Sequence, residues 1–111
     1  MSVITAPQSI RALNDEFRQS LRGGMVVFTA GVIALGREAQ TGILQTIAAF
    51  ESFDEGNDPY GEHDFGAFEH EGERLFFKID YYDLELTAHS LDPADASVTK
   101  RVLTIMLAEE Y

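Results

Sequence analysis

The apolar positions in the first half of the chain predict a helix, a strand and a second helix. A first helix from Pro7 to the pair Gly23–Gly24 carries one narrow apolar stripe, formed by Ile10, Leu13, Phe17 and Leu21. Residues 25–30 are apolar on both alternating faces, which predicts a strand that is covered on both sides. Residues 31–36 are expected to turn the chain. A second helix is expected over residues 37–53, with Ile43, Leu44, Ile47 and Phe50 on one face.

A hairpin is the clearest pattern in the second half. Residues 54–62 are rich in turn formers, and residues 64–70 and 74–82 then alternate around a turn at Glu71–Gly72. The expected partners are Phe68 with Leu75, Gly66 with Phe77, Glu69 with Arg74, Ala67 with Phe76, and Phe65 with Lys78. Extending the same register places Asp64 opposite Ile79 and His63 opposite Asp80.

The last forty residues predict a further strand and a final helix. Alternation over residues 84–89 indicates a third hairpin strand. Asp92 resembles a helix N-cap, with Pro93 in the first turn and Asp95 three residues on. The apolar residues that follow cover about half of a helix circumference, so this helix is either central to the core or covered by a partner chain in a homodimer.

Together these elements predict an α+β fold for residues 1–111, with one small domain in the order helix, strand, helix, hairpin, helix. The length leaves room for a single hydrophobic core. We expect a mainly antiparallel sheet with the helices packed on it.

Charge is distributed unevenly along the chain, whose formal net charge is −11. Residues 38–73 contain ten carboxylates and no Lys or Arg. We therefore expect no direct binding of nucleic acid, because affinity for phosphate comes from clustered basic side chains. Arg11, Arg18 and Arg22 lie beside the apolar stripe of the first helix, and we expect them to pair with this acidic segment.

The sequence contains no cysteine and no apolar run long enough to span a bilayer, and from its first residues we expect no signal peptide. These features predict a cytoplasmic protein that does not associate with membranes. No phosphate-binding glycine loop, nucleophile elbow or paired-histidine motif is present, and we expect no cofactor.

One polar cluster could carry chemistry. In the extended hairpin register Asp80 would orient the imidazole of His63 as a general base, with Lys78 beside them. Four residues could instead bind a divalent metal, namely Asp58, His63, Asp64 and Asp80. The structural alternative is that these groups cap turns and satisfy a polar sheet edge.

A competing hypothesis uses the acidity itself. Spaced carboxylates can imitate the charge of nucleic acid and bind a basic protein such as a nuclease, a repressor or a defence complex. The candidate contact residues are Glu51, Asp54, Glu55, Asp58, Glu62, Glu69, Glu71 and Glu73. We prefer this interaction role to that of a small metal-assisted or general-base enzyme.

Four segments carry a resemblance to known proteins, at residues 57–66, 78–83, 92–95 and 101–111. In these segments the chain resembles a family of short bacterial proteins of unknown function, common in alphaproteobacteria and often encoded on plasmids and integrative elements. The likeness covers residues 10–111. It implies an accessory role in mobile-element biology and supplies no catalytic residues.

Overall fold

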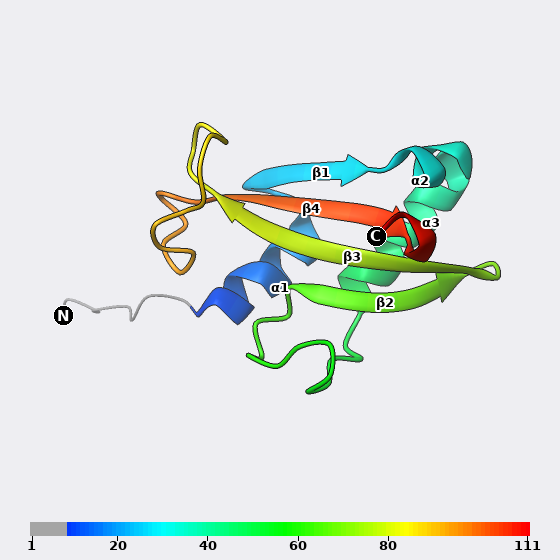
Figure 1. The fold of residues 1–111 in the computed structure, drawn as a ribbon, viewed down its shortest axis with the longest axis horizontal. Coiled ribbons are helices and arrows are strands. Elements are labelled where there is room, and N and C mark those ends of the chain that lie inside the picture. The colour runs from blue at the N-terminus through cyan, green and yellow to red at the C-terminus, as the bar shows by residue number, and fades with distance from the viewer. Residues whose placement is uncertain (1–8) are drawn as a thin grey trace.

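The structure, a computed structural model that describes residues 9–111, confirms the α+β class. Its elements are α1 (Ile10–Ser20), β1 (Gly24–Phe28), α2 (Ala30–Ala34), α3 (Arg37–Ala49), β2 (Phe65–His70), β3 (Glu73–Tyr82), β4 (Lys100–Leu107) and the 3-10 helix η1 (Ala108–Glu110). The strands form one sheet in the order β1-β4-β3-β2, in which only the β1–β4 pair is parallel (Figure 1). Within the described residues, no helix is long and apolar enough to cross a membrane.

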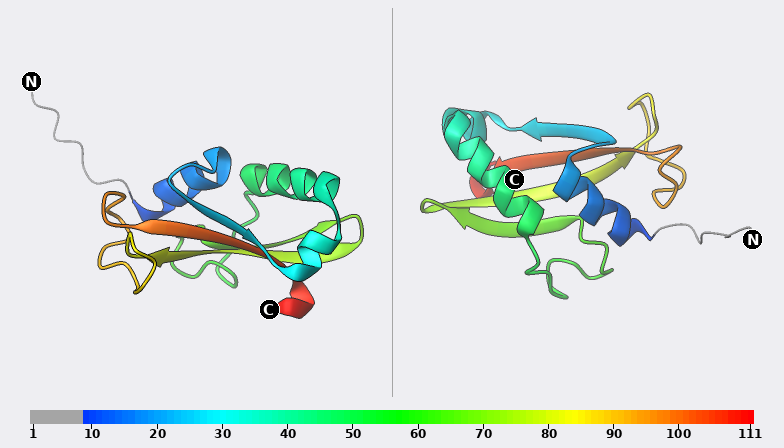
Figure 2. Two further views of the ribbon diagram at one scale, coloured as in Figure 1. Left: turned by 90° about the horizontal axis from the view of Figure 1, so that it is seen from above. Right: turned by 180° about the vertical axis from the view of Figure 1, so that it is seen from behind.

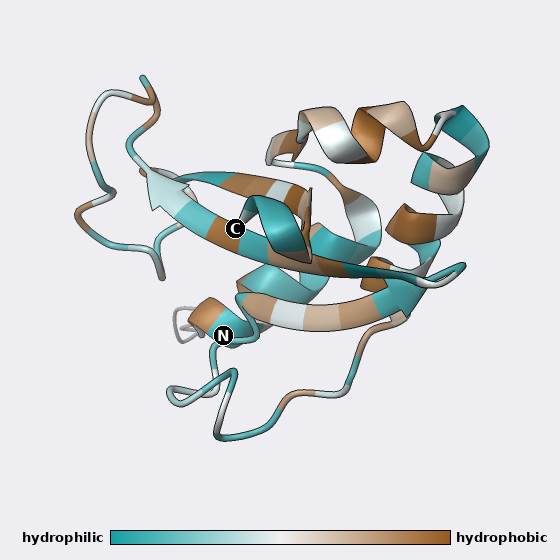
Figure 3. Cartoon of the chain, turned by 45° about the vertical axis from the view of Figure 1, so that its right-hand side comes forward, coloured by the Kyte–Doolittle hydropathy of each residue, from teal (hydrophilic) through white to brown (hydrophobic). Residues whose placement is uncertain are grey.

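The helices α1 and α3 lie side by side on one face of the sheet (Figure 2). Buried and less buried positions alternate along most of β3 and β4, and Figure 3 shows hydrophobic and hydrophilic residues following one another along the strands. The fully buried side chains between the layers include Ile43, Ile47, Leu75, Phe77, Leu103 and Ile105. The opposite face, which we call the open face, carries η1 and Tyr111, whose ring lies near Phe65 and Phe76.

Helix α1 is anchored by its cap and by a buried arginine. Ser9 accepts a hydrogen bond from the backbone N–H of Ala12 as the N-cap; the start predicted at Pro7 lies outside the described residues. Arg18, predicted to pair with the acidic segment, is 3% exposed instead. Its guanidinium donates hydrogen bonds to the carbonyls of Ile47 and Phe50, at 2.6 and 3.1 Å. These bonds provide donors for backbone carbonyls at the C-terminal end of α3.

The hairpin of β2 and β3 has the predicted register at all five expected pairs. Its loop is the two residues Glu71 and Gly72, both with positive φ, as a type I′ turn requires. Gly66 is needed for packing, because a Cβ atom at this position would collide with the rings of Phe77 and Phe50.

The final helix is the main prediction that is wrong. Residues 100–107 form β4, the central strand between β1 and β3, and residues 92–99 form a loop. Asp92 caps a turn by accepting from the N–H of Ala94, and no helix follows it. The β-branched residues of this segment favour a strand, and alternation places Leu103 and Ile105 inward with both neighbouring strands paired.

Three smaller predictions also need correction. Residues 84–88 form a loop that is linked to β3 by one bridge, between Tyr82 and His89, because β4 already occupies the position beside β3. Residues 30–34 form the short helix α2 where a turn was expected. Strand β1 is an edge strand covered on one face, since Met25 and Val27 on the other face are 40% and 38% exposed.

Candidate functional site

A buried polar network joins α1 to the sheet and to the loop that precedes β2. Asn14, which is fully buried, donates to the Tyr81 hydroxyl at 2.8 Å and to the Glu62 carbonyl at 3.0 Å. Its own carbonyl accepts from Nε of Arg101 at 2.8 Å. The Tyr81 hydroxyl in turn donates to Asp64 at 3.1 Å. The network therefore holds both ends of the segment 62–64 against the core.

Two aspartates give the loop 51–64 its shape. Asp54 accepts from the N–H groups of Gly56 and Asn57, which closes a tight turn. Asp58 is only 7% exposed and accepts from the N–H groups of Glu62 and His63. Because its carboxylate faces the inside of the loop, Asp58 does not belong to the surface on which it was predicted.

His63 has a different carboxylate partner from the one expected. Its φ of 56° turns the backbone away from the extended path, and β2 begins only at Phe65, so the ladder ends before His63 reaches Asp80. Its Nδ1 lies 2.9 Å from Oδ1 of Asp15 on α1, and its Nε2 lies 3.9 Å from Oδ2 of Asp58. The ring stacks on Phe53 with 3.9 Å between centroids.

Three other residues of the predicted polar cluster, Lys78, Asp80 and Asp64, have hydrogen-bond and ion-pair partners other than His63. Lys78 and Asp80 pair with each other at 3.3 Å on the open face of β3. The backbone of Asp64 has the predicted register, since its carbonyl accepts a hydrogen bond from the N–H of Ile79. Its carboxylate accepts a hydrogen bond from the hydroxyl of Tyr81. Across residues 9–111, no group of three or more His, Asp or Glu side chains is arranged to hold a metal ion.

A hollow of about 220 Å³ opens beside His63. Its lining consists of Asp15, Arg18, Gln19, Ala48, Phe50, Glu51, Phe53 and His63. Arg18 closes its inner side and lies 5.1 Å from the ring centroid of Phe53. None of the lining residues carries a hydroxyl or a thiol, and both ring nitrogens of His63 face carboxylates. The hollow therefore offers an oriented imidazole without a hydroxyl or thiol nucleophile in its lining.

The carboxylates around this loop differ in their affinity for protons. Burial raises the pKa of Asp15, but hydrogen bonds from Arg18 and His63 outweigh it and hold that pKa below its ordinary value. Burial, reinforced by neighbouring carboxylates, raises the pKa of Glu62 and that of Asp64 above their ordinary values. The loop thus concentrates negative charge, which nearby positive groups compensate only in part.

Seven exposed or partly exposed carboxylates of the acidic segment form two groups, one at each end of β2, whereas the exposed Glu38 lies on α3. Glu51, Asp54 and Glu55 are exposed and Glu62 is partly exposed in the loop before the strand, and we call these four the loop group. Glu69, Glu71 and Glu73 are exposed at the hairpin tip, and we call them the hairpin group. Strand β2, whose six residues span about 20 Å, connects the two groups, and Glu69 lies near its C-terminal end. Among the described residues, none of these seven carboxylates forms an ion pair.

Sequence reasoning missed Asn14, Asp15, Tyr81 and Arg101 as the residues that organise the loop. A signal was present for Asn14, which lies four residues after Ile10 and three before Phe17, within the apolar stripe. Arg101 shares the phase of Leu103 and Ile105, but this phase is visible only once residues 100–107 are known to be a strand.

The comparisons with known proteins give a family for most of the chain. A family described as "Protein of unknown function (DUF3768)" matches residues 28–110. The chain belongs to the DUF3768 family. The DUF3768 match runs from the end of β1 to the end of η1 and includes both acidic groups and His63, whereas α1 with Asn14 and Asp15 precedes it. Neither a curated protein nor a solved structure matches the chain.

Proposed function

We propose that this DUF3768 protein is an acidic interaction module that binds a basic partner protein through the loop group and the hairpin group. The observation that carries the proposal is that seven carboxylates, which have no ion-pair partner within residues 9–111, lie in two groups at the ends of one strand. Hydrogen bonds with Asn14 and Asp58 hold the backbone of Glu62, and Asp54 closes the turn around Glu55, so less ordering entropy is lost when a partner binds.

Two blocks of negative charge on a rigid frame suit a protein whose groove normally holds nucleic acid. The partner would be a nuclease, a repressor or a defence complex, and the module would act as a nucleic-acid mimic. The resemblance to proteins encoded on plasmids and integrative elements supports an anti-defence or other accessory role. Complementary charge of this kind mainly accelerates association, and its effect weakens with salt.

The alternative function is a small general-base enzyme that uses His63. The 2.9 Å contact with Asp15 favours it, because a carboxylate at Nδ1 orients an imidazole for proton transfer. The second carboxylate, Asp58, and the lack of a hydroxyl or thiol among the residues that line the hollow weigh against it. An interaction module should keep its partner after His63→Gln, whereas an enzyme of this type would lose its turnover.

The test uses three double variants with the same change in net charge. Glu51→Lys with Glu55→Lys reverses the loop group, and Glu69→Lys with Glu71→Lys reverses the hairpin group. The matched control reverses two exposed glutamates elsewhere, Glu16 and Glu109. Partners captured from a bacterial lysate with the wild-type protein are identified by mass spectrometry, purified and titrated against each variant at several salt concentrations.

We expect both test variants to bind the purified partner more weakly at low salt, and the control to bind as the wild type does. Duplex DNA should compete with the protein for the partner, and the protein alone should not shift DNA in a gel. Equal weakening in the control would show that only net charge matters and would refute a defined acidic surface. Binding that DNA does not displace would refute mimicry.

A further inference from the structure

Two loops beyond one end of the sheet expose apolar side chains that the fold does not bury. Residues 83–89 and 90–99 project past the ends of β3 and β4, on the side of the molecule away from the hairpin tip (Figure 1). Leu91 is 99% exposed, Leu84 59% and Val98 41%. These three, which we call the apolar loop patch, line a hollow of about 380 Å³ together with Asp83 and Glu85.

The loops are held in place by polar bonds that do not involve the patch. Asp83 accepts from both the N–H and the hydroxyl of Thr87 at 2.9 and 3.1 Å. The hydroxyls of Ser90 and Thr99 bond at 2.6 Å, and Thr99 also donates to the carbonyl of Asp92 at 2.8 Å. Because the loops are fixed, their leucines remain at the surface in a defined arrangement. Clustered apolar side chains of this kind mark contact surfaces.

The backbone conformation of Leu86 is an unusual feature of the first of these loops. Leu86 has a φ of 61° and is 42% exposed. A branched side chain seldom adopts the left-handed region, and such strain is concentrated at functional positions. This conformation belongs to a turn in which the N–H of Leu86 donates to the carbonyl of Asp83 at 3.0 Å, next to Leu84.

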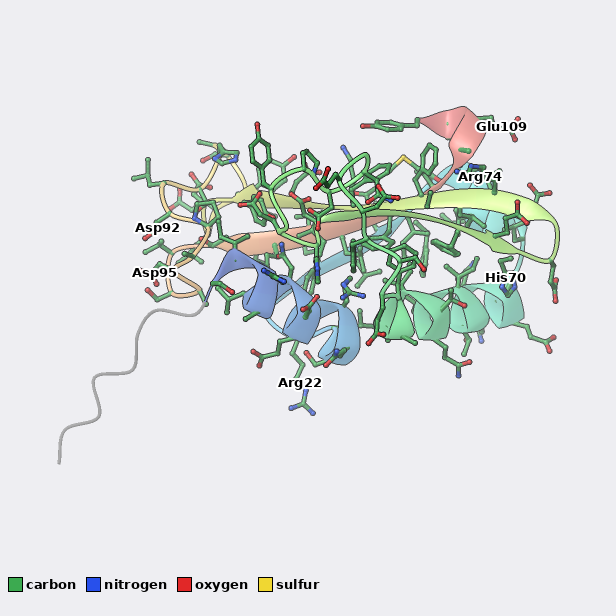
Figure 4. The ribbon with its side chains drawn as sticks, turned by 90° about the horizontal axis from the view of Figure 1, so that it is seen from below. Arg22, His70, Arg74, Asp92, Asp95 and Glu109 are labelled. Atoms are coloured by element: carbon green, nitrogen blue, oxygen red, sulfur yellow. The ribbon has the colours of Figure 1, made fainter. Side chains whose placement is uncertain are left out.

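The charges around the apolar loop patch indicate which kind of partner can bind there. Residues 83–99 contain the carboxylates of Asp83, Glu85, Asp92 and Asp95 and no Lys or Arg. Asp92 and Asp95 lie at the same end of the molecule (Figure 4). A second copy of this chain on the patch would bring these carboxylates against their own counterparts, and an anionic membrane would be repelled as well. A partner segment with apolar side chains flanked by basic residues matches both the hollow and its rim.

We propose that the apolar loop patch binds an amphipathic, basic helical segment of a partner protein, with one or two apolar side chains of that helix in the hollow. Anchoring of an amphipathic helix by a few apolar side chains in a groove is a common mode of peptide recognition. The site is separate from the loop and hairpin groups, so it can be tested without reference to them.

The probe is a fluorescent synthetic peptide of leucine and lysine, about 18 residues long, with its leucines on one helical face. One control peptide has glutamate in place of lysine, and another has serine in place of leucine. We expect a dissociation constant on the order of micromolar for a surface of this size. Both control peptides should bind at least about tenfold more weakly.

The decisive variant is Leu84→Ser with Leu91→Ser, which should weaken peptide binding roughly ten- to a hundredfold. The matched control is Ile33→Ser on α2, since Ile33 is 58% exposed and Leu84 59%. The control should bind like the wild type. All of these positions are exposed, so melting temperatures should stay close to that of the wild type, which verifies folding.

The remaining outcomes separate this proposal from the acidic module. Reversal of the loop group or the hairpin group should leave peptide affinity within about twofold of the wild type. If those reversals abolish binding and the double leucine variant retains it, the peptide binds the acidic groups and the proposal is overturned. It is also overturned if sedimentation shows a wild-type dimer that Leu91→Ser dissociates, because the occupant is then a second copy.

Discussion

The substitution Asn14→Ala should destabilise the protein more than any other single change of a polar residue on α1. Asn14 is fully buried and takes part in three hydrogen bonds, to Tyr81, to the carbonyl of Glu62 and from Arg101. Alanine removes all three at once and takes this partner from two buried residues, Tyr81 and Arg101. The Arg101 Nε is the most costly of these, because it belongs to a charged group.

The magnitude follows from the contacts. Three hydrogen bonds at about 0.5–1.5 kcal/mol each give about 1.5–4.5 kcal/mol, to which the unpaired donor of Arg101 and a small cavity add. We expect a loss of about 3–5 kcal/mol in the free energy of unfolding. For a domain of this size that corresponds to a fall in melting temperature of about 12–20 °C.

Urea unfolding followed by circular dichroism measures this loss. The control is Gln19→Ala, an exposed position on the same helix, which should change the free energy by less than about 0.5 kcal/mol. Asn14→Leu keeps the volume and removes the polar groups, so it should cost nearly as much as alanine. If Asn14→Leu is as stable as the wild type, the hydrogen bonds do not carry the stability and the reasoning is refuted.

A double-mutant cycle with Tyr81→Phe tests the network directly. In that background Asn14→Ala should cost about 1 kcal/mol less, because no tyrosine hydroxyl is left without its donor. Additive losses would show that Asn14 and Tyr81 contribute independently.

Three further predictions concern the loop, the turn and the strained leucine. Burial raises the pKa of Asp64, so its contribution to stability is present below the ordinary carboxyl pKa and is lost as pH rises through the higher folded-state pKa. Asp64→Asn should therefore raise the melting temperature at pH 7 and lose this advantage near pH 4, and a pH-independent difference would contradict the assignment. Glu71→Asn should increase the free energy of unfolding by about 0.5–1 kcal/mol, because asparagine tolerates the φ of 50° in the type I′ turn; a decrease in urea unfolding would count against that turn. Leu86→Gly should leave stability unchanged or raise it by up to about 1 kcal/mol in the same assay, whereas a clear loss would show that Leu86 supports the fold.

The hairpin was predictable because local alternation and a glycine-containing turn fix its register without help from the rest of the chain. The last strand was not, since Asp92 and Pro93 imitate a helix start and the apolar residues after them suit either structure. What decides in favour of a strand is pairing with β1 and β3, which are distant in sequence. The alternation of apolar and polar residues in this strand is obscured by Arg101, because this buried arginine occupies an inward position where an apolar residue is usual.

The acidic residues of the site could be predicted from the sequence, but their arrangement in space could not. The acidic segment and its exposed glutamates are visible in the sequence, and the structure places them in two groups. The partner of His63 was not visible, because a single left-handed residue ends the ladder at that point, and no local rule places Asp15 beside it. Asp58 was assigned to the surface because a loop aspartate is usually exposed, whereas its carboxylate caps the loop from within.

The parallel pairing of β1 with β4 has a consequence for synthesis of the chain. Gly24 pairs with Arg101 and Phe28 with Ile105, so β1 has no strand partner until nearly the whole described chain has been translated. At the usual rate of elongation this delay is on the order of ten seconds. During this delay β1 stays unpaired, and α1 and α3 have only the β2–β3 hairpin to pack against. Folding is therefore expected to follow translation, and a chain that stops before β4 should depend on chaperones.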